Sequence, residues 1–522
     1  MHLFALLACA TTPPPIASAP PAPSAAPEPP RLVVAVVIDQ LRADYLTRFE
    51  DTYLPPEGDE GVGGFRYLME RGAWYPFGEH RVYQAMTGPG HATVLTGAWP
   101  ARTGIASNGW YDEAHVGTYC VADPEHGISP RNLRAPTLGD AIKSSGWDAR
   151  VVSIAHKDRA AVLMGGYRAD VAMWWDREEA AWTSSSFYDP LPDWVSGLAL
   201  DDEPLTWAEA GPGNGRSEEG DAGFSESMTP GDGPWRSSPF AMTHTVDAAI
   251  AALEAEALGA DAAPDVLAVS LSAFDKLGHA LGPNHRKMEA MAVAADAELA
   301  RLLRAVDASV GLDRALVVLT GDHGAPSAPD YLAPEGVPSE YLDEEAIEVG
   351  LEEALTAAFG PGPAEGWVTG SVKLNVYLRH EDQSLDEQAA MERAAAAWLA
   401  EQPGVVGAWA AADVRAGRLP PGILGEGIAN QYVQHRSGDV LGAAQAFHMP
   451  GDPNNPSSDR VRHFTHYTYD RMVPIVFAGP GILPGRYAEP AAVVDIAPTL
   501  SYLLGVLPPA VSEGRVLSEA LE

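Results

Sequence analysis

The chain has 522 residues, of which 46% are hydrophobic and 20% are charged, the proportions of an ordinary globular protein. That length predicts a large core with a sizeable insertion, or two domains. The formal net charge of −37 argues against a nucleic-acid-binding function, because no basic stretch is available to neutralise phosphates. An anionic ligand would need local positive charge, and the chain has only five lysines, Lys143, Lys157, Lys276, Lys287 and Lys373.

Residues 1–30 are predicted to be a leader and tether. A short apolar stretch precedes small residues and a Pro/Ala-rich run, as in secretory signals, although the basic amino-terminal region is missing. Residues 6–9 resemble a bacterial lipobox, in which Cys9 would be lipidated and residues 10–30 would be an extended tether. A plain signal peptide and a misplaced start codon are the alternatives. We expect an exported protein, either periplasmic or anchored in the outer membrane as a lipoprotein.

The two cysteines predict no internal disulfide. If Cys9 lies in a processed leader, Cys120 is left alone, and we expect it to be buried and inert. No segment beyond the leader reaches the roughly 18 uninterrupted apolar residues that a membrane-spanning helix needs.

Buried strands alternate with amphipathic helices along the rest of the chain. Residues 32–38 are a continuous, β-branched apolar run, which is typical of a strand buried on both faces in a parallel sheet. The same pattern recurs at residues 266–271, 315–320 and 473–477. Helical patterns lie between these runs, at residues 242–257 and 286–305. The alternation predicts an α/β/α sandwich with a mostly parallel central sheet.

We predict that a cap interrupts this core. The core would comprise residues 31–345 and 446–522, and the inserted cap residues 346–445. Within the cap an Ala/Glu-rich helical pattern dominates at residues 385–401. Residues 200–238 are rich in Gly, Asp, Glu and Ser and are expected to form a surface excursion.

Aspartate and histidine follow the first three predicted strands closely. Asp39 ends the first, and Asp275 and His279 follow the second with a spacing that puts both on one face of a helical turn. Asp322 and His323 follow the third. Ligand sites in such sheets gather at the carboxyl ends of the strands, and Asp and His are zinc ligands, so the pattern predicts a metal site.

Thr87 is the candidate nucleophile. It opens the segment Thr87-Gly-Pro-Gly-His-Ala-Thr93, and a threonine among metal ligands can be activated to attack an electrophile. Together with the strand-end residues, it suggests a two-metal hydrolase whose threonine attacks phosphorus.

Five segments resemble the alkaline phosphatase superfamily, specifically its bacterial branch with a threonine nucleophile, which is related to the nucleotide pyrophosphatase/phosphodiesterases. They occur in the family's order at residues 37–42, 87–97 continuing to 104–110, 272–279, 321–324 and 463–470. Residues 495–499 also resemble the carboxyl-terminal segment of the family. The resemblance spans roughly residues 31–345 and 446–510 and leaves the cap uncovered.

The resemblance implies two zinc ions as cofactors. One would be held by Asp275, His279 and His463. The other would be held by Asp39, Asp322 and His323, with the Thr87 oxygen as its fourth ligand. A covalent phosphothreonine would form first and would then be hydrolysed to release phosphate. The resemblance also gives Asn108 the role of donating its amide to a phosphoryl oxygen.

The remaining histidines have other expected roles. His466 is an alternative ligand to His463, although the spacing of His463 to Asp470 matches the family better. His91 is expected to shape its loop through local hydrogen bonds. Two further histidines are expected to be structural or exposed, His156 and His285.

Lys157 and Arg159 bear on the substrate. They follow a predicted strand at residues 151–154, where the monoesterase branch has a Lys and an Arg two residues apart and diesterase relatives lack the pair. A monoester presents two negative charges and three non-bridging oxygens, so a site for it benefits from extra cations. The pair favours a monoesterase, and ordinary surface charges are the alternative interpretation.

Three classes of function stay open. The first is an exported zinc phosphomonoesterase, and the second is a phosphodiesterase or nucleotide pyrophosphatase on the same scaffold. The third is a non-catalytic binding or surface protein, and a cytoplasmic manganese phosphomutase is disfavoured by the leader and by Thr in place of Ser. We expect small phosphorylated molecules as partners, no nucleic acid, and a monomer.

Overall fold

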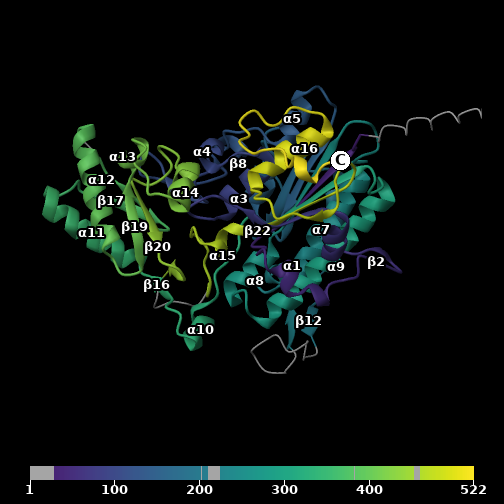
Figure 1. The fold of residues 1–522 in the computed structure, drawn as a ribbon, viewed down its shortest axis with the longest axis horizontal. Helices are drawn as coiled ribbons and strands as arrows, with labels where there is room; N and C mark the ends of the chain where they lie inside the picture. Colours follow the sequence, from purple (N-terminus) through teal and green to yellow (C-terminus); the bar gives the residue numbers. More distant parts are fainter. Residues whose placement is uncertain (1–28, 202, 210–223, 381–382, 452–458) are drawn as a thin grey trace, which may run out of the picture.

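The computed structural model describes residues 29–201, 203–209, 224–380, 383–451 and 459–522. Cys9 and almost all of the predicted leader lie outside these residues. The described chain divides into a large sheet-centred core and a smaller lobe, seen in green at the left of Figure 1. Within the described residues, no helix is both long and apolar enough to cross a membrane.

A nine-stranded sheet forms the centre of the core, in the order β11-β10-β9-β14-β1-β15-β22-β4-β23. Five neighbouring strands are parallel: β10 (Val171–Asp176), β9 (Val151–Ala155), β14 (Asp265–Leu271), β1 (Leu32–Ile38) and β15 (Ala315–Thr320). The register pairs Ile38 with Leu271 and Val37 with Thr320, so the carboxyl ends of β14, β1 and β15 are level. The residues that follow these three strands therefore meet at one edge of the sheet.

The predicted strand at residues 473–477 is present as β22 (Met472–Ala478), but its direction differs from the expected one. It runs antiparallel to β15 and to β4 (Ala73–Glu79). Its pairing with β4 is irregular between Val473 and Ile475, on either side of Pro474, which has no N–H to give to a ladder. The sheet is thus mostly, but not wholly, parallel. Two short strands complete its edges, β11 (Ala181–Thr183) and β23 (Gly485–Arg486).

Both faces of the sheet are covered by helices, as the α/β/α prediction requires. Alternate residues of β1 point to opposite faces. Val34 and Val36 belong to a core with α7 (Pro239–Ala255) and α9 (Arg286–Ser309). Val33 and Val37 belong to a core with α5 (Leu138–Ser144) and α16 (Ile496–Leu504). Figure 1 shows these helix pairs on opposite sides of the strands.

The smaller lobe has a sheet and an apolar core of its own. Its four strands are antiparallel: β17 (Val368–Val372), β18 (Asn375–Leu378), β20 (Val440–Ala444) and β19 (Val405–Ala410). Helices α11 (Glu344–Phe359) and α12 (Leu385–Ala400) pack on this sheet around Leu351 and Met391. The strands β16 (Glu340–Leu342) and β21 (His448–Pro450) pair where the chain enters and leaves the lobe. We call residues 346–445 of this lobe the cap.

Two smaller predictions concern single segments. Part of the 200–238 excursion is an antiparallel hairpin of β12 (Leu205–Glu209) and β13 (Phe224–Met228), and its remaining middle lies outside the described residues. Cys120 is fully buried, and burial raises the pKa of its thiol to about 12, so it is an inert thiol as expected.

Candidate active site

The candidate site lies where β1, β14 and β15 end, and Thr87 stands at its centre. Thr87 is the first residue of α3 (Thr87–Thr96), a helix whose residues are all buried. Its Oγ1 lies 3.2 Å from His323 Nε2 and 3.5 Å from Lys157 Nζ. A Cβ atom on Gly90 would lie 2.3 Å from the carbonyl oxygen of Asp322, so this glycine lets α3 approach the loop after β15.

Two buried aspartates contact one buried lysine, and the buried Asp322 also acts on it electrostatically. Lys157 Nζ lies 2.5 Å from Asp39 Oδ2 and 2.5 Å from Asp275 Oδ2. Burial, together with the negative charges of Asp275 and Asp322, raises the pKa of Asp39 well above its usual range. Burial favours the neutral amine of Lys157, but Asp275 and Asp39 outweigh it and raise the pKa of this group. One ammonium group facing three carboxylates leaves the site with excess negative charge.

The predicted ligand histidines are held in one orientation. The Nδ1 atoms of His279, His323 and His463 lie 2.7, 3.0 and 2.8 Å from the carbonyl oxygens of Val461, Gly324 and Ala85, respectively. A carbonyl oxygen only accepts hydrogen bonds, so each Nδ1 carries a hydrogen, and in the neutral ring each Nε2 presents a lone pair. Histidines that bind metals are oriented in the same way by a partner on the other nitrogen.

These Nε2 atoms face carboxylate oxygens. His279 Nε2 is 3.2 Å and His463 Nε2 3.9 Å from Asp275 Oδ1. His323 Nε2 is 3.4 Å from an oxygen of Asp39 and 3.3 Å from one of Asp322. Burial lowers the pKa of both His323 and His463, which favours their neutral, ligand-competent forms.

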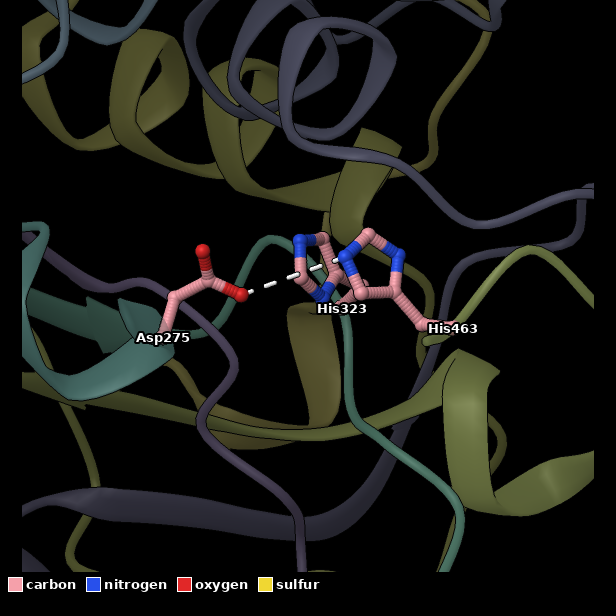
Figure 2. Close-up of side chains that lie close together, drawn as sticks. All are labelled: Asp275, His323 and His463. Atoms are coloured by element: carbon pink, nitrogen blue, oxygen red, sulfur yellow. Dashed lines mark ion pairs between the residues drawn. The ribbon is translucent and has the colours of Figure 1, made fainter. Parts of the chain in front are cut away.

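The two predicted ligand sets adjoin each other at His323. The ligand atoms of Asp275, His323 and His463 lie within 4.8 Å of one another, as do those of Asp39, His91 and Asp322. Figure 2 shows the Asp275 carboxylate directed at the rings of His323 and His463. Those two rings stack with their centroids 3.6 Å apart.

The donor atoms fit metal ions. Within the described residues, Asp39 Oδ1 and Asp322 Oδ2 are buried and accept no well-oriented hydrogen bond, whereas Asp39 Oδ2 is paired with the Lys157 ammonium group. Buried carboxylate oxygens without such partners are costly unless a cation compensates them. Nitrogen and carboxylate donors of this kind suit zinc and other divalent transition metals.

Lys157 and Arg159 approach the site from the start of α6 (Asp158–Gly165), directly after β9. Lys157 reaches Thr87, as described above. Arg159 donates to the Tyr119 hydroxyl oxygen at 3.2 Å, and Tyr119 in turn donates to Asp158 at 2.6 Å. The lysine is therefore at the nucleophile, while the arginine is held beside it by Tyr119.

Asn108 is oriented from the other side of Thr87. Its Oδ1 accepts a hydrogen bond from the backbone N–H of Gly88 at 2.7 Å. Within the described chain its NH2 group has no hydrogen-bond partner. The side chain thus has a donor group to offer next to the nucleophile.

His91 makes the expected local hydrogen bond and one to a distant residue, and its Nδ1 also lies 3.2 Å from Asp322 Oδ2. Its Nδ1 lies 2.9 Å from the Thr87 carbonyl oxygen and its Nε2 2.8 Å from Ser270 Oγ. His156 is buried and its ring stacks on those of Trp175 and Trp235, which agrees with a structural role.

The structure separates His463 from His466. His463 belongs to the cluster just described, whereas the ring of His466 packs on Tyr467 at 4.2 Å. Within the described residues, His466 belongs to none of the groups that could hold a metal.

Sequence reasoning missed Gln40. Its backbone N–H donates to Asp322 Oδ1 at 2.9 Å, and its Nε2 donates to Asp275 Oδ1 at 2.7 Å. Gln40 thereby ties two predicted ligands of different ions together, from a backbone with φ of 67°. The only sequence signal was its place directly after Asp39.

Comparisons with known proteins agree with this geometry. The model of a family described as type I phosphodiesterase / nucleotide pyrophosphatase matches residues 33–445. The chain therefore belongs to this family, which lies within the alkaline phosphatase superfamily.

Similar proteins are named as alkaline phosphatases. PafA of Elizabethkingia meningoseptica is 28% identical, with 94% of each chain covered. PhoV of Synechococcus elongatus is 29% identical, with 94% of this chain and 93% of the relative covered. The crystal structure of PafA matches with a TM-score of 0.81 and 25% identity, over 96% of this chain and 100% of that one. The protein is thus an enzyme that hydrolyses phosphate esters.

Proposed function

We propose that the enzyme hydrolyses phosphate monoesters with two zinc ions, through a covalent phosphothreonine, and releases inorganic phosphate. The observation that carries this proposal is the position of Lys157, whose ammonium group lies 3.5 Å from Thr87 Oγ1 in a buried site. A fixed cation beside the nucleophile favours a transferred group with two negative charges over one with a single charge.

The residues that would hold zinc form the two sets predicted from sequence. Asp275, His279 and His463 form one set. Asp39, Asp322 and His323 form the other, with the Thr87 oxygen beside them. When bound, the two ions would favour the alkoxide of Thr87 and neutralise charge on the transferred phosphoryl group.

The chain's own residues define two displacement steps. Thr87 Oγ loses its proton and forms a bond to phosphorus as the bond from phosphorus to the leaving oxygen breaks, and the leaving oxygen takes up a proton. In the second step a water oxygen bonds to phosphorus, loses a proton, and displaces Thr87 Oγ, which takes up a proton. The amino-terminal N–H groups of α3, the Asn108 amide and the Lys157 and Arg159 cations would stabilise the phosphoryl oxygens in both steps.

The relatives support the monoester assignment. PafA, PhoV and the 30% identical PhoK of a Sphingomonas species are all named alkaline phosphatases. A variant of PafA has been crystallised with a threonine, an asparagine, a lysine and an arginine substituted. These are the residue types that this chain presents as Thr87, Asn108, Lys157 and Arg159.

A phosphodiesterase is the second candidate, because the family description names that activity. Zinc content and initial rates on an aryl phosphate monoester and a matched diester would decide between the two. About two zinc ions per chain with strong monoester preference would support the proposal. Diester preference would overturn the assignment of monoesters as substrates, and turnover without bound zinc would overturn the assignment of zinc as the cofactor.

We also propose that the enzyme is exported and acts as a monomer on small phosphorylated molecules. Export is supported by the leader-like composition of residues 1–30 and the lipobox-like segment ending at Cys9. Labelling with a radioactive fatty acid, in wild type and in a Cys9→Ser variant, tests the anchor. Label that persists in the variant would contradict lipidation at Cys9.

A further inference from the structure

One hairpin of the cap reaches into the core close to the nucleophile. Strands β17 and β18 are joined by the two residues Lys373 and Leu374, flanked by the pair Val372 and Asn375. Both turn residues have positive φ, 53° and 66°. Turns of this kind favour Asn-Gly, so a Lys-Leu pair in this conformation is strained.

Hydrogen bonds join the turn to the segment that leads to Thr87. Gln84 Nε2 donates to the carbonyl oxygen of Lys373 at 2.5 Å, and Asn375 Nδ2 donates to Gln84 Oε1 at 2.7 Å. The Tyr83 hydroxyl also donates to Asn375 Oδ1. The two contacts of Asn375 are buried and that of Lys373 is partly buried, and together they hold the tip of the cap against Gln84, three positions before Thr87 in the chain.

A second strained residue faces the turn from the core. Phe464 has φ of 115°, which is unusual for a bulky side chain. Its half-buried ring packs on the ring of His463 with centroids 4.5 Å apart. Lys373 Nζ lies 5.0 Å from the centroid of the same ring. Strain of this kind persists where the surrounding structure over-determines it, and it concentrates at ligand sites.

The position of Phe464 relates it to the leaving group. Thr87 adjoins the ligand set that contains His323. In an in-line displacement the leaving oxygen lies opposite the attacking oxygen, and with the two ligand sets of the proposed function this is the side of Asp275, His279 and His463. The Phe464 ring packs on His463, so it lies beside the side of the site to which the leaving oxygen would point.

Lys373 supplies positive charge at this place. The chain has a net charge of −37, so positive charge at this place stands against a negative background. Glu344 holds the residue, since its Oε1 accepts from the Lys373 backbone N–H at 2.9 Å and its Oε2 lies 3.6 Å from Nζ. The lysine side chain is still 26% exposed, so its ammonium group can take a second anionic partner.

We propose that Lys373 and Phe464 form a leaving-group subsite for an aromatic alcohol that carries a negatively charged substituent. The aromatic ring stacks on Phe464, and the anionic substituent pairs with Lys373. This inference rests on the proposed phosphomonoesterase function, and it gives the cap a role in substrate selection.

The test compares 4-carboxyphenyl phosphate with 4-carbamoylphenyl phosphate, two substrates of nearly equal shape that differ in charge. The measured quantity is the ratio of their kcat/KM values in each variant, because intrinsic reactivity cancels when variants are compared. Lys373→Asn removes the charge and suits the positive φ, Lys373→Arg retains the charge, and Lys287→Met removes a lysine charge from the start of α9.

The carboxylate-to-carboxamide ratio should fall about fivefold in K373N, the size of a partly exposed ion pair, and should stay within about twofold in K373R and K287M. A Phe464→Leu variant with unchanged zinc content should lose about fivefold on both aryl substrates but not on methyl phosphate. An unchanged ratio in K373N, or equal loss on both substrates, would overturn the subsite and leave the proposed function intact. Failure of the wild type to release phosphate from any substrate would instead overturn the proposed function.

Discussion

Replacing Lys157 by Met should reduce monoester turnover far more than diester turnover. The substitution removes an ammonium group that lies 3.5 Å from Thr87 Oγ1. At that separation and an effective dielectric of about 20, Coulomb's law gives about 5 kcal/mol for each unit of phosphoryl charge. Removal of one donor from an oxyanion site costs about 3–4 kcal/mol in practice, and we adopt about 3 kcal/mol for the additional charge of a monoester.

This free energy corresponds to a loss in monoester kcat/KM that is about 100-fold larger than the loss in diester kcat/KM. The assay measures initial rates on a matched aryl monoester and diester, with zinc content determined for each sample. Lys143→Met is the control, because Lys143 pairs with Asp170 beside α5, away from Thr87. Equal losses on the two substrates, with zinc retained, would refute the reasoning and remove the argument for a monoesterase.

Three further outcomes test the site and its support. Gly90→Ala should lower the free energy of unfolding by about 2–3 kcal/mol, because its Cβ would lie 2.3 Å from the Asp322 carbonyl oxygen; an unchanged Tm would contradict this. Removing metal with a chelator should abolish turnover and lower Tm, since the buried Asp39 Oδ1 and Asp322 Oδ2 atoms would lose a compensating charge, and zinc should restore both. Burial raises the pKa of the Asp470 carboxyl to about 8, above the ordinary value of 3.8. The folded state therefore binds this proton more tightly than the unfolded state, and the stability that results is complete below about pH 4 and is lost as pH rises through 8. Urea unfolding from pH 5 to 9 should therefore show a downward slope of up to about 1.4 kcal/mol per pH unit that Asp470→Asn reduces, and equal slopes would exclude this carboxyl as the cause.

Much of the core was predictable because its signals are local. A continuous apolar run such as residues 32–38 specifies a strand buried on both faces, and the structure has β1 at those residues. The four-residue spacing of Asp275 and His279 places both on α8 (Ala273–Leu281) by helical geometry alone. Because level parallel strands end at one edge of a sheet, the order of strands and polar residues along the chain was enough to predict that the strand-end residues meet.

Other features depend on partners far away in the chain. An apolar run such as residues 473–477 carries no information on direction, and β22 proved to be antiparallel through its pairing with β15 and β4. Sequence spacing left His463 and His466 as alternatives, and the carbonyl of Ala85 orients only the first toward the cluster.

The composition and short motifs of this chain determined the class of fold and the kinds of side chain available for chemistry, because periodicity and spacing act over a few residues. The tertiary structure decided that Gln40 bridges Asp275 and Asp322 and that the cap turn at Lys373 faces Phe464. These contacts join residues separated by 90 positions or more, and no local pattern encodes which distant partner a side chain will meet.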